Sequence, residues 1–546
     1  MSNPPISRLN RFFESSPLRH PAFRHYYIGG LGVSLGYTMQ ATMAAWLMAT
    51  LTPSALMVAL VQTASTAPAL LFGLIAGALA DLVDRRKVIL VTQSVLLAGT
   101  ALLGVTTLVG LIGPGSLLFL TFVIGSGFML AIPAQQASIN ELVSRPDLPR
   151  AVALGAVSFN MARAVGPALA GAIAALLTSG SAFLAAALCF LPLILVVRSW
   201  KPREPSLPGV PETLLSGVQS GLRFARHSPA MRALVIRNVT FCLCGSSFWA
   251  LLPVIARDQL ALGAGGFGLL SASFGAGAVA GALWIPRRLK TVSLNSVVTG
   301  GVLLWIVATL VVAASHITVI AVAGAVGVGV AWVSVLASLS AGTQSTAPDW
   351  VRARAVSATL VAVQASLALG SAVWGAVASA GGTQLALVIS AAAMLVLHML
   401  NRRYPVGMGT EAEVTTGVQL PDIAMAIEPM PNDGPVLIQL EYRIDPENEA
   451  AFIRAIHDVE PTRRRNGATS WRVFRDVGEA GRFVERYVIA SWAEYVRLRL
   501  RMTFADREIQ ERVAQLQREG VPVRVSRLIG VNPTEGLPAD GEPADS

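Results

Sequence analysis

Polar side chains within long apolar segments are the residues of this sequence whose types and positions could do chemistry. Arg163 is the most conspicuous, because it lies near the middle of the apolar run 151–178. A cation at that depth of a bilayer costs about 2.5–3.5 kcal/mol on insertion scales, so it should face a cavity or a partner, or else reach toward the membrane surface. Such groups mark pathways for polar solutes, with hydrogen bonding between helices as an equal alternative. The other candidates for a pathway are Gln40, Gln62, Gln135, Gln136, Asn140, Asn160, Arg237, Asn238 and Gln364.

Acidic residues are missing from the interiors of the apolar segments. An embedded carboxylate can take up and release a proton during a cycle, but only acids near segment ends are available here. The candidates for coupling are Asp81, Glu141 and Asp258. His398 is a further titratable group, although a lone histidine in an apolar segment is more often a packed residue. No Gly-x-x-x-x-Gly-Lys-Ser/Thr motif occurs in the sequence, so it offers no evident means of hydrolysing ATP.

The apolar segments themselves predict a membrane protein. The chain has 546 residues, of which 53% are hydrophobic and 14% are charged, a composition too apolar for an ordinary soluble domain. A helix of about 20 apolar residues crosses the hydrocarbon core. The twelve candidate spans are 25–50, 54–80, 88–112, 115–142, 151–178, 181–198, 230–257, 264–286, 293–314, 317–344, 353–379 and 382–401. Cys189, Cys242 and Cys244 all fall inside spans at spacings that do not suit a metal site, and neither a metal nor a cofactor is expected.

The charges between these spans predict their orientation. Residues before 411 include 25 of the 42 Lys and Arg but only 9 of the 32 Asp and Glu. Of these basic residues, 22 fall in the N-terminus, in alternate loops and after the last span, whereas the opposite side has only Arg257. Because basic loops stay in the cytoplasm, both termini are expected there. Membrane topology thus explains the net charge of +10, and no nucleic-acid partner is expected.

The two sets of six spans resemble each other in the order of their loop and glycine residues. A shift of 202 residues, with two more inserted before the glycines, relates the halves. The matched pairs are Arg85-Arg86 with Arg287-Arg288, Pro146-Asp147 with Pro348-Asp349, Arg150 with Arg352, Gly166 with Gly370, and Gly171 with Gly375. A parallel duplication of this kind suits two similar halves that pivot around a central site.

The sequence changes character after Arg403. Strands are expected at 436–442, 470–476, 482–490 and 521–529, with helices at 452–459 and 491–517, which gives the βαββαβ order of a ferredoxin-like unit. The expected division is a cytoplasmic N-terminus (1–24), an N-terminal six-helix bundle (25–198), a cytoplasmic loop with an amphipathic helix (199–229), a C-terminal six-helix bundle (230–403), a linker (404–434), the α+β domain (435–530) and a disordered tail (531–546).

The turn at 77–87 resembles the signature loop of the major facilitator superfamily, G-x-L-x-D-x-x-x-R-R-K. Gly77, Asp81 and the basic run from Arg85 match, whereas Leu82 and Asp84 depart from the pattern. The resemblance implies a conformational lock formed by Gly77, Asp81, Arg85 and Arg86, with Arg352 and Arg354 as candidate partners of Asp81. A solvated turn that obeys the positive-inside rule is the alternative.

The fifth span resembles the G-P-x-x-G-G motif of the exporters in this superfamily. Arg163, Gly166, Pro167 and Gly171 carry the resemblance, and Ala170 replaces one glycine. A proline beside small residues suits a pliable gating helix, although ordinary small-residue packing is the alternative. Residues 263–268 fit G-x-G-x-x-G, but they follow no strand and are expected to be a loop that opens a span.

Nearly the whole chain is similar to the transmembrane secretion effector branch of the superfamily, which includes enterobactin-exporter-like proteins. The similar stretches are 77–86, 160–171, 351–355, 441–445 and 490–494. The resemblance implies an all-α polytopic membrane protein of two six-helix bundles plus a C-terminal α+β ferredoxin-like domain. It also implies a secondary active exporter, not an enzyme, that moves small amphiphilic molecules such as siderophores or antibiotics across the bacterial inner membrane by alternating access, coupled to the proton gradient.

The C-terminal region resembles the dimeric α+β barrel of antibiotic-biosynthesis-monooxygenase-like proteins. His457, Trp471 and Trp492 lie there, but their spacing matches no known catalytic arrangement. A packing role or self-association is therefore the favoured interpretation. The alternative is a membrane-tethered enzyme whose C-terminal domain acts on the substrate.

Overall fold

The computed structural model describes residues 16–73, 76, 83–199, 222–289, 291–348, 350–415 and 429–530, which form two compact units. The first unit contains most of the helical chain up to Gly407. The second contains the C-terminal region together with residues 222–234 and 341–358 from between the helices. Gly77, Asp81 and the side chain of Asn140 lie outside the described part of the chain, as do the predicted amphipathic helix and the tail.

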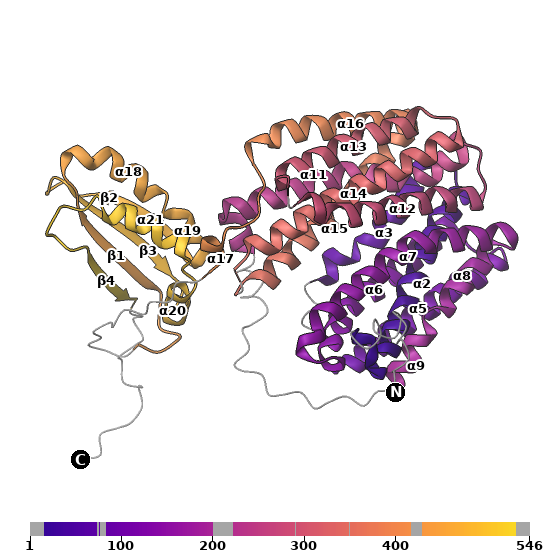
Figure 1. The fold of residues 1–546 in the computed structure, drawn as a ribbon, viewed down its shortest axis with the longest axis horizontal. Helices are drawn as coiled ribbons and strands as arrows, with labels where there is room; N and C mark the ends of the chain where they lie inside the picture. Colours follow the sequence, from indigo (N-terminus) through magenta and orange to yellow (C-terminus); the bar gives the residue numbers. More distant parts are fainter. Residues whose placement is uncertain are drawn as a thin grey trace, which may run out of the picture. The chain divides into compact units, whose positions relative to one another are not determined.

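Long helices joined by short turns build the membrane part of the chain (Figure 1). The N-terminal half contains α2 (Pro21–Leu51), α3 (Ala55–Thr66), α5 (Arg85–Leu108), α6 (Pro114–Leu142), α7 (Leu148–Leu176), α8 (Ser179–Leu188) and α9 (Leu191–Ser199). The C-terminal half contains α11 (Pro229–Val254), the π-helical turn η3 (Ile255–Gln259), α12 (Ala264–Arg288), α13 (Leu294–Ala314), α14 (Thr318–Thr346), α15 (Arg352–Gly381) and α16 (Thr383–Leu400). Serine caps start several helices; the Ser293 hydroxyl, for example, accepts a hydrogen bond from the Ser296 amide at 3.2 Å.

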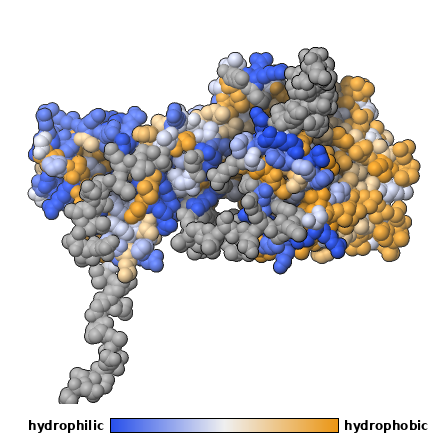
Figure 2. Space-filling view, turned by 60° about the horizontal axis from the view of Figure 1, so that its bottom comes forward, coloured by the Kyte–Doolittle hydropathy of each residue, from blue (hydrophilic) through white to orange (hydrophobic). Residues whose placement is uncertain are grey.

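Eleven helical segments of the described chain are long and apolar enough to cross a membrane, and they coincide with the second to twelfth predicted spans. The first predicted span lies within α2, a helix of 31 residues whose composition is more polar. Leu111, Leu176 and Val319 are more than three-quarters exposed, and Figure 2 shows hydrophobic residues gathered over the helical surface. An outward-facing apolar surface is what lipid requires, so the polytopic all-α part of the fold is confirmed.

Matching glycines of the two halves make matching helix contacts. A Cβ on Gly166 of α7 would lie 2.1 Å from Thr38 Oγ1 on α2. A Cβ on Gly370 of α15 would lie 2.3 Å from the Leu243 carbonyl oxygen on α11. Only glycine permits either approach. The repeat seen in the sequence therefore corresponds to the same packing arrangement, used once in each half.

The C-terminal region forms one antiparallel sheet with the strand order β2-β3-β1-β4. Its elements are β1 (Val436–Arg443), α18 (Glu449–His457), α19 (Glu460–Asn466), β2 (Ala468–Arg475), β3 (Arg482–Ile489), α20 (Trp492–Leu500), α21 (Phe504–Ala514) and β4 (Arg524–Ile529). The strands and their order along the chain are those predicted. The predicted helix at 452–459 corresponds to α18, and it is followed by a short helix that was not predicted, α19, which Pro461 starts. The predicted helix at 491–517 is instead two helices, because the Thr503 capping box starts α21.

Glu485 on β3 is fully buried beneath the helices of this region and is surrounded by donors. Its carboxylate accepts hydrogen bonds from Arg463 Nε, Trp471 Nε1 and the Tyr442 hydroxyl, each at 3.0 Å. Burial acts against the charge of Arg463, but the nearby Glu485 carboxylate raises the pKa of Arg463 overall. Trp471 is therefore held by Glu485 inside the domain, which agrees with a packing role for this residue.

Trp350, which precedes α15, packs within the second unit against the C-terminal region. The Arg501 guanidinium lies 4.3 Å from the centre of the Trp350 ring, and the Phe224 ring meets Trp350 edge-on at 6.0 Å. Arg223 donates a hydrogen bond to the Gly467 carbonyl at 3.2 Å. The C-terminal region is therefore attached to the short segments that lead into α11 and α15.

Candidate functional site

A cavity of about 250 Å³ lies among helices from both halves of the first unit. Tyr37, Gln62 and Arg163 line it from the N-terminal half, and Trp332 and Gln364 line it from the C-terminal half. Most of the wall is apolar, with a few polar groups that converge on the space. A central cavity of this kind, between two similar halves, has the form of a carrier's binding site.

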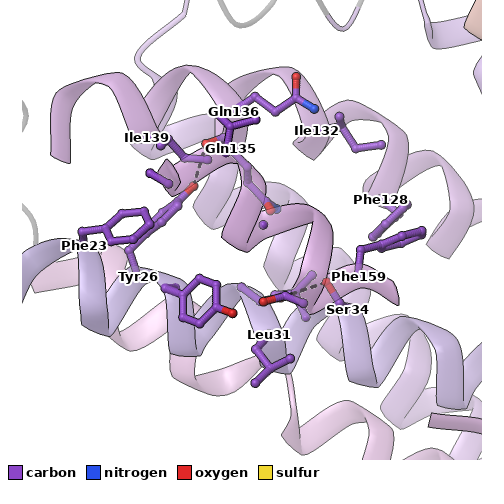
Figure 3. Close-up of a pocket in the computed structure, with 17 residues that line it drawn as sticks. Phe23, Tyr26, Leu31, Ser34, Phe128, Ile132, Gln135, Gln136, Ile139 and Phe159 are labelled. Carbon is purple, nitrogen blue, oxygen red and sulfur yellow. Dashed lines mark hydrogen bonds between the residues drawn. The ribbon is translucent and has the colours of Figure 1, made fainter. Parts of the chain in front are cut away.

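A second cavity, of about 480 Å³, lies between α2, α6 and α7 of the N-terminal half (Figure 3). Phe128, Ile132 and Phe159 line both cavities, so the two spaces adjoin. Near the start of α2, the Tyr26 hydroxyl donates a hydrogen bond to the Gln135 carbonyl at 3.1 Å. The second cavity therefore leads from the centre of the helices toward the end at which α2 begins.

Arg163 lies about midway along α7, roughly 20 Å from either helix end at 1.5 Å per residue. That distance exceeds the reach of an arginine side chain, and Arg163 lines the central cavity. Its guanidinium lies 5.0 Å from the centre of the Phe159 ring, a cation–π contact. Of the two alternatives given by the sequence, the geometry favours a cavity-facing arginine over one that reaches for the membrane surface.

The structure brings only some of the predicted pathway residues together. Gln62, Gln364 and Arg163 line the central cavity, as does Pro167 of the gating motif, and Gln135 and Gln136 line the second cavity. Those not among the lining residues are Gln40, Asn160, Arg237 and Asn238. The aromatic residues Tyr37, Phe128, Phe159, Trp249 and Trp332 also line these cavities; the sequence search for polar groups missed them.

Arg237 is buried inside the C-terminal half and takes part in a local polar cluster. Its Nη1 lies 3.0 Å from His398 Nδ1, and its Nε and Nη2 donate to the Tyr404 carbonyl at 3.4 Å. Nη2 also donates to Asn295 Oδ1 at 3.5 Å. Helix-to-helix hydrogen bonding therefore describes Arg237 better than contact with a substrate, and His398 is its packed partner.

The predicted gating helix α7 packs against α12 through small residues. A Cβ on Gly171 would lie 2.8 Å from the Gly268 Cα, and a Cβ on Gly275 would lie 2.4 Å from the Ala164 Cα. The expectation of a loop at 263–268 is wrong, because Gly263 is the N-cap of α12 and the following residues form its first turn. The glycines of this motif allow the backbones of α7 and α12 to come into contact.

The repeat predicts a second contact of this kind, and α15 supplies it against α3. A Cβ on Gly375 would lie 3.1 Å from the Leu56 Cα. The Leu56 amide donates a hydrogen bond to the Ser379 hydroxyl at 2.9 Å, and Thr63 Oγ1 donates to the Ala368 carbonyl at 2.9 Å. The two halves thus meet along two equivalent helix pairs, α7 with α12 and α3 with α15.

Arg257 joins the halves where α2 ends and α12 begins, which we call the closed end. Its Nη1 donates hydrogen bonds to the carbonyls of Ala49 and Thr52, at 2.9 Å for Thr52. Asp258, a predicted coupling residue, forms a paired contact with the same guanidinium, with Nη2 and Oδ2 2.7 Å apart. These bonds use carbonyls that a helix C-terminus leaves without partners.

The basic residues of the predicted lock make contacts within the N-terminal half. Arg85 forms an ion pair with Glu141, another predicted coupling residue, at the end of α6. Arg86 donates to the carbonyls of Val197 and Arg198 at 3.1 and 2.5 Å, which fastens α5 to the end of α9.

Of the predicted partners of Asp81, Arg352 donates from Nε to the carbonyls of Gln344 and Ala347 at the end of α14, at 3.1 and 3.2 Å. Arg354 is described in α15 within the same unit. Since Gly77 and Asp81 lie outside the described residues, the lock itself stays a prediction.

Asp147 is a well-connected acid that the search for candidate sites did not select. Its carboxylate accepts hydrogen bonds from the Ser144 hydroxyl at 2.9 Å and from Arg19 at 2.7 Å, and His20 Nε2 lies 3.3 Å away. The bonds from Ser144, His20 and Arg19 lower the pKa of Asp147 despite its burial. The match of Asp147 with Asp349 in the internal repeat is the sequence feature that could have identified this position.

The family profile described as "Transmembrane secretion effector" matches residues 14–535 of the chain. The staphyloferrin A transporter of Staphylococcus aureus is 25% identical over 287 residues, which cover 52% of this chain and 68% of that protein. The multidrug efflux pump Tap of Mycolicibacterium fortuitum is 27% identical over 369 residues, 65% of this chain and 88% of the pump. The enterobactin exporter EntS of Citrobacter koseri is 29% identical over 282 residues, 48% of this chain and 63% of that exporter.

Among solved structures, a bacterial homologue of the human lysosomal transporter Spinster matches with a TM-score of 0.58 at 14% identity. The match covers 71% of this chain and 98% of that structure, which establishes the fold. With a family match over almost its full length, this chain belongs to the transmembrane secretion effector family of the major facilitator superfamily and is a multi-pass membrane transporter.

Proposed function

We propose that this protein is a secondary active exporter of small amphiphilic molecules, such as siderophores or antibiotics, that works by alternating access. One observation carries the proposal. The halves are joined across the closed end, while the central cavity adjoins a second cavity that leads toward the opposite end. In a carrier that is closed on one side and open on the other, a pivot of the two halves is enough to expose the central cavity to the opposite side of the membrane.

The orientation predicted by the basic loops places the open side of the cavities in the cytoplasm. With both termini in the cytoplasm, the start of α2 lies on that side and the closed end faces away from it. The cavity would then be loaded from the cytoplasm, as export requires. The names of the staphyloferrin A, Tap and EntS relatives support siderophores and drugs as the substrate classes. Membership of a bacterial family of membrane exporters supports the inner membrane as the location.

The proton gradient is the proposed energy source. Glu141 forms an ion pair with Arg85, so its protonation would release a contact that joins α6 to α5. Asp258 forms an ion pair with its neighbour Arg257, so its protonation would free the guanidinium that binds the carbonyl groups at the end of α2. Asp81 is the third candidate, in the predicted lock with Gly77, Arg85, Arg86, Arg352 and Arg354. Proton uptake at such a position would couple the gradient to the pivot of the halves.

The proposed division keeps the two bundles at 25–198 and 230–403 and assigns 435–530 to a non-catalytic domain. Its contacts with Arg223, Phe224 and Trp350 support a structural role near the starts of α11 and α15, with self-association as a further option. Removal of residues 431–546 tests this role. Transport that survives the deletion argues against the membrane-tethered enzyme, whereas turnover of substrate by the removed region would support that enzyme.

Purified protein in proteoliposomes tests the transport proposal itself. Vesicles with an imposed pH gradient, an imposed voltage, or neither would be loaded with a panel of siderophores and amphiphilic drugs. We expect gradient-driven movement of at least one compound and its loss in Asp81→Asn, with normal insertion of the variant into the membrane. Full transport by Asp81→Asn would contradict the lock, and no gradient-driven transport of any compound would contradict the exporter.

A further inference from the structure

The described residues that line the adjoining cavities carry a net positive charge. Among the described residues that line them, Arg163 is the only charged side chain. Within the described part of the chain, its one close partner is the Phe159 ring, 5.0 Å from the guanidinium, and no carboxylate pairs with it. A cation enclosed by low-dielectric walls without a counter-ion attracts anions and repels cations more strongly than it would in water.

Flat apolar surfaces surround this charge. The rings of Tyr37 and Phe128 stack with their centres 3.8 Å apart and their planes 7° from parallel. Trp249 and Trp332 line the same cavity from the C-terminal half. Aromatic walls bind flat apolar groups, and the neutral side chain of Gln364 adds hydrogen bonding without adding charge.

We propose that the transported molecules are organic anions with a flat apolar or aromatic part, and that Arg163 binds the anionic group. This inference rests on the proposed export function and adds charge selectivity to its central cavity. The guanidinium supplies two parallel donors to a carboxylate, a sulfonate or a catecholate, while the aromatic walls cover the apolar part. An amphiphilic cation of the same shape would meet the same walls but a repulsive charge.

A pair of xanthene dyes isolates the effect of charge from the effect of shape. Carboxyfluorescein is an anion and rhodamine 123 is a cation built on the same ring system. Binding of each dye would be measured by fluorescence anisotropy, with the full-length protein in phosphatidylcholine nanodiscs and empty nanodiscs as the blank. Zwitterionic lipid leaves no anionic headgroup to compete for Arg163.

We expect the wild type to bind carboxyfluorescein more tightly than rhodamine 123. Arg163→Gln should weaken carboxyfluorescein binding by about ten- to a hundredfold, the usual loss for one charge-assisted hydrogen-bonded contact, without weakening rhodamine 123. Arg163→Lys, which keeps the charge, should retain part of the preference for the anion. Arg288→Gln changes an exposed arginine beside Trp284 and should match the wild type.

Two results overturn the inference. Equal carboxyfluorescein binding by wild type and Arg163→Gln would remove the role of the arginine, and tighter binding of rhodamine 123 by the wild type would reverse the charge preference. Either result leaves the exporter proposal standing, because the proteoliposome panel measures transport itself and depends neither on Arg163 nor on the charge of the compound. If that panel shows no transport while the dyes behave as expected, the exporter fails and the anion site stands.

Discussion

Arg257 donates a hydrogen bond at 2.9 Å to the carbonyl oxygen of Thr52, the C-cap residue of α2. The donor belongs to the C-terminal half and the acceptor to the N-terminal half, so the bond crosses the closed end. The C-terminus of a helix carries partial negative charge on its free carbonyls, which makes it a natural partner for a guanidinium. When this end opens, those carbonyls must exchange their hydrogen bonds from Arg257 for hydrogen bonds from water.

Arg257→Gln should weaken the closed end. A hydrogen bond to a charged group contributes about 1.5–3 kcal/mol when buried, and less at a partly exposed site such as this one. We expect faster amide hydrogen exchange in 49–57 and 259–267, measured by mass spectrometry in detergent or nanodiscs. Arg288→Gln is the control for loss of a surface charge. Unchanged exchange in Arg257→Gln would show that the packing of α7 on α12 closes this end without help.

Gly171→Ala should hold the halves apart. The new methyl group would lie 2.8 Å from the Gly268 Cα, and backbone atoms cannot move aside as a flexible side chain can. We expect transport to fall about tenfold or more, equivalent to about 1.4 kcal/mol against the closed state. Gly300→Ala is the matched control, because a Cβ there meets no atom within 4 Å. Equal transport by the two variants would argue against close contact at Gly171.

The sequence predicts the helical fold well because lipid imposes a simple rule: apolar length marks a span and basic loops mark a side. It also predicts the close helix contacts at Gly166 and Gly171, because glycines beside a proline in a span are typical of helices that pack closely. The helix α19 and the division of the predicted helix 491–517 were missed. In these segments tertiary packing determines where each helix begins and ends, and local composition does not.

The cavity residues were only partly predictable. Arg163 stands out in sequence because a charge is costly in lipid, and Gln62 and Gln364 stand out because a polar amide without a partner is also costly there. The aromatic lining residues give no such signal, since Trp249 or Phe128 in an apolar span is equally suited to face lipid. Arg237 was wrongly predicted to line the pathway, because a buried charge can also be satisfied within one half. Here His398 and the Tyr404 carbonyl are its partners.

Asp147 should make stability depend on pH in the acid range. Its contacts lower the pKa of the folded carboxyl below the ordinary value of 3.8. The ionised group therefore stabilises the fold above the ordinary value, and this contribution is lost as the pH falls through the folded value. Thermal unfolding of Asp147→Asn should show a lower midpoint than wild type near pH 6, and the difference should shrink toward pH 3. A difference that grows on acidification would reverse this assignment.

Glu485→Gln should destabilise the C-terminal domain far more than loss of a partly exposed ion pair. Arg463 would keep its charge with almost no exposure to water, and breaking a buried pair in this way costs about 3–5 kcal/mol. Glu460→Gln breaks a partly exposed i,i+4 pair with Arg464 in the same helix and should cost about 0.3–0.5 kcal/mol. Hydrogen exchange of β1 and β3 in the full-length protein measures both. Similar protection in the two variants would show that Arg463 is not held by Glu485.

Cross-linking the halves at the closed end tests alternating access most directly. The Ser379 hydroxyl lies 2.9 Å from the Leu56 amide nitrogen, so Leu56→Cys with Ser379→Cys places two thiols across the seam, in a chain whose Cys189, Cys242 and Cys244 are replaced by alanine. Oxidation should abolish transport in proteoliposomes of a compound that the reduced variant carries, and a reductant should restore it. Full transport by quantitatively cross-linked protein would contradict the account.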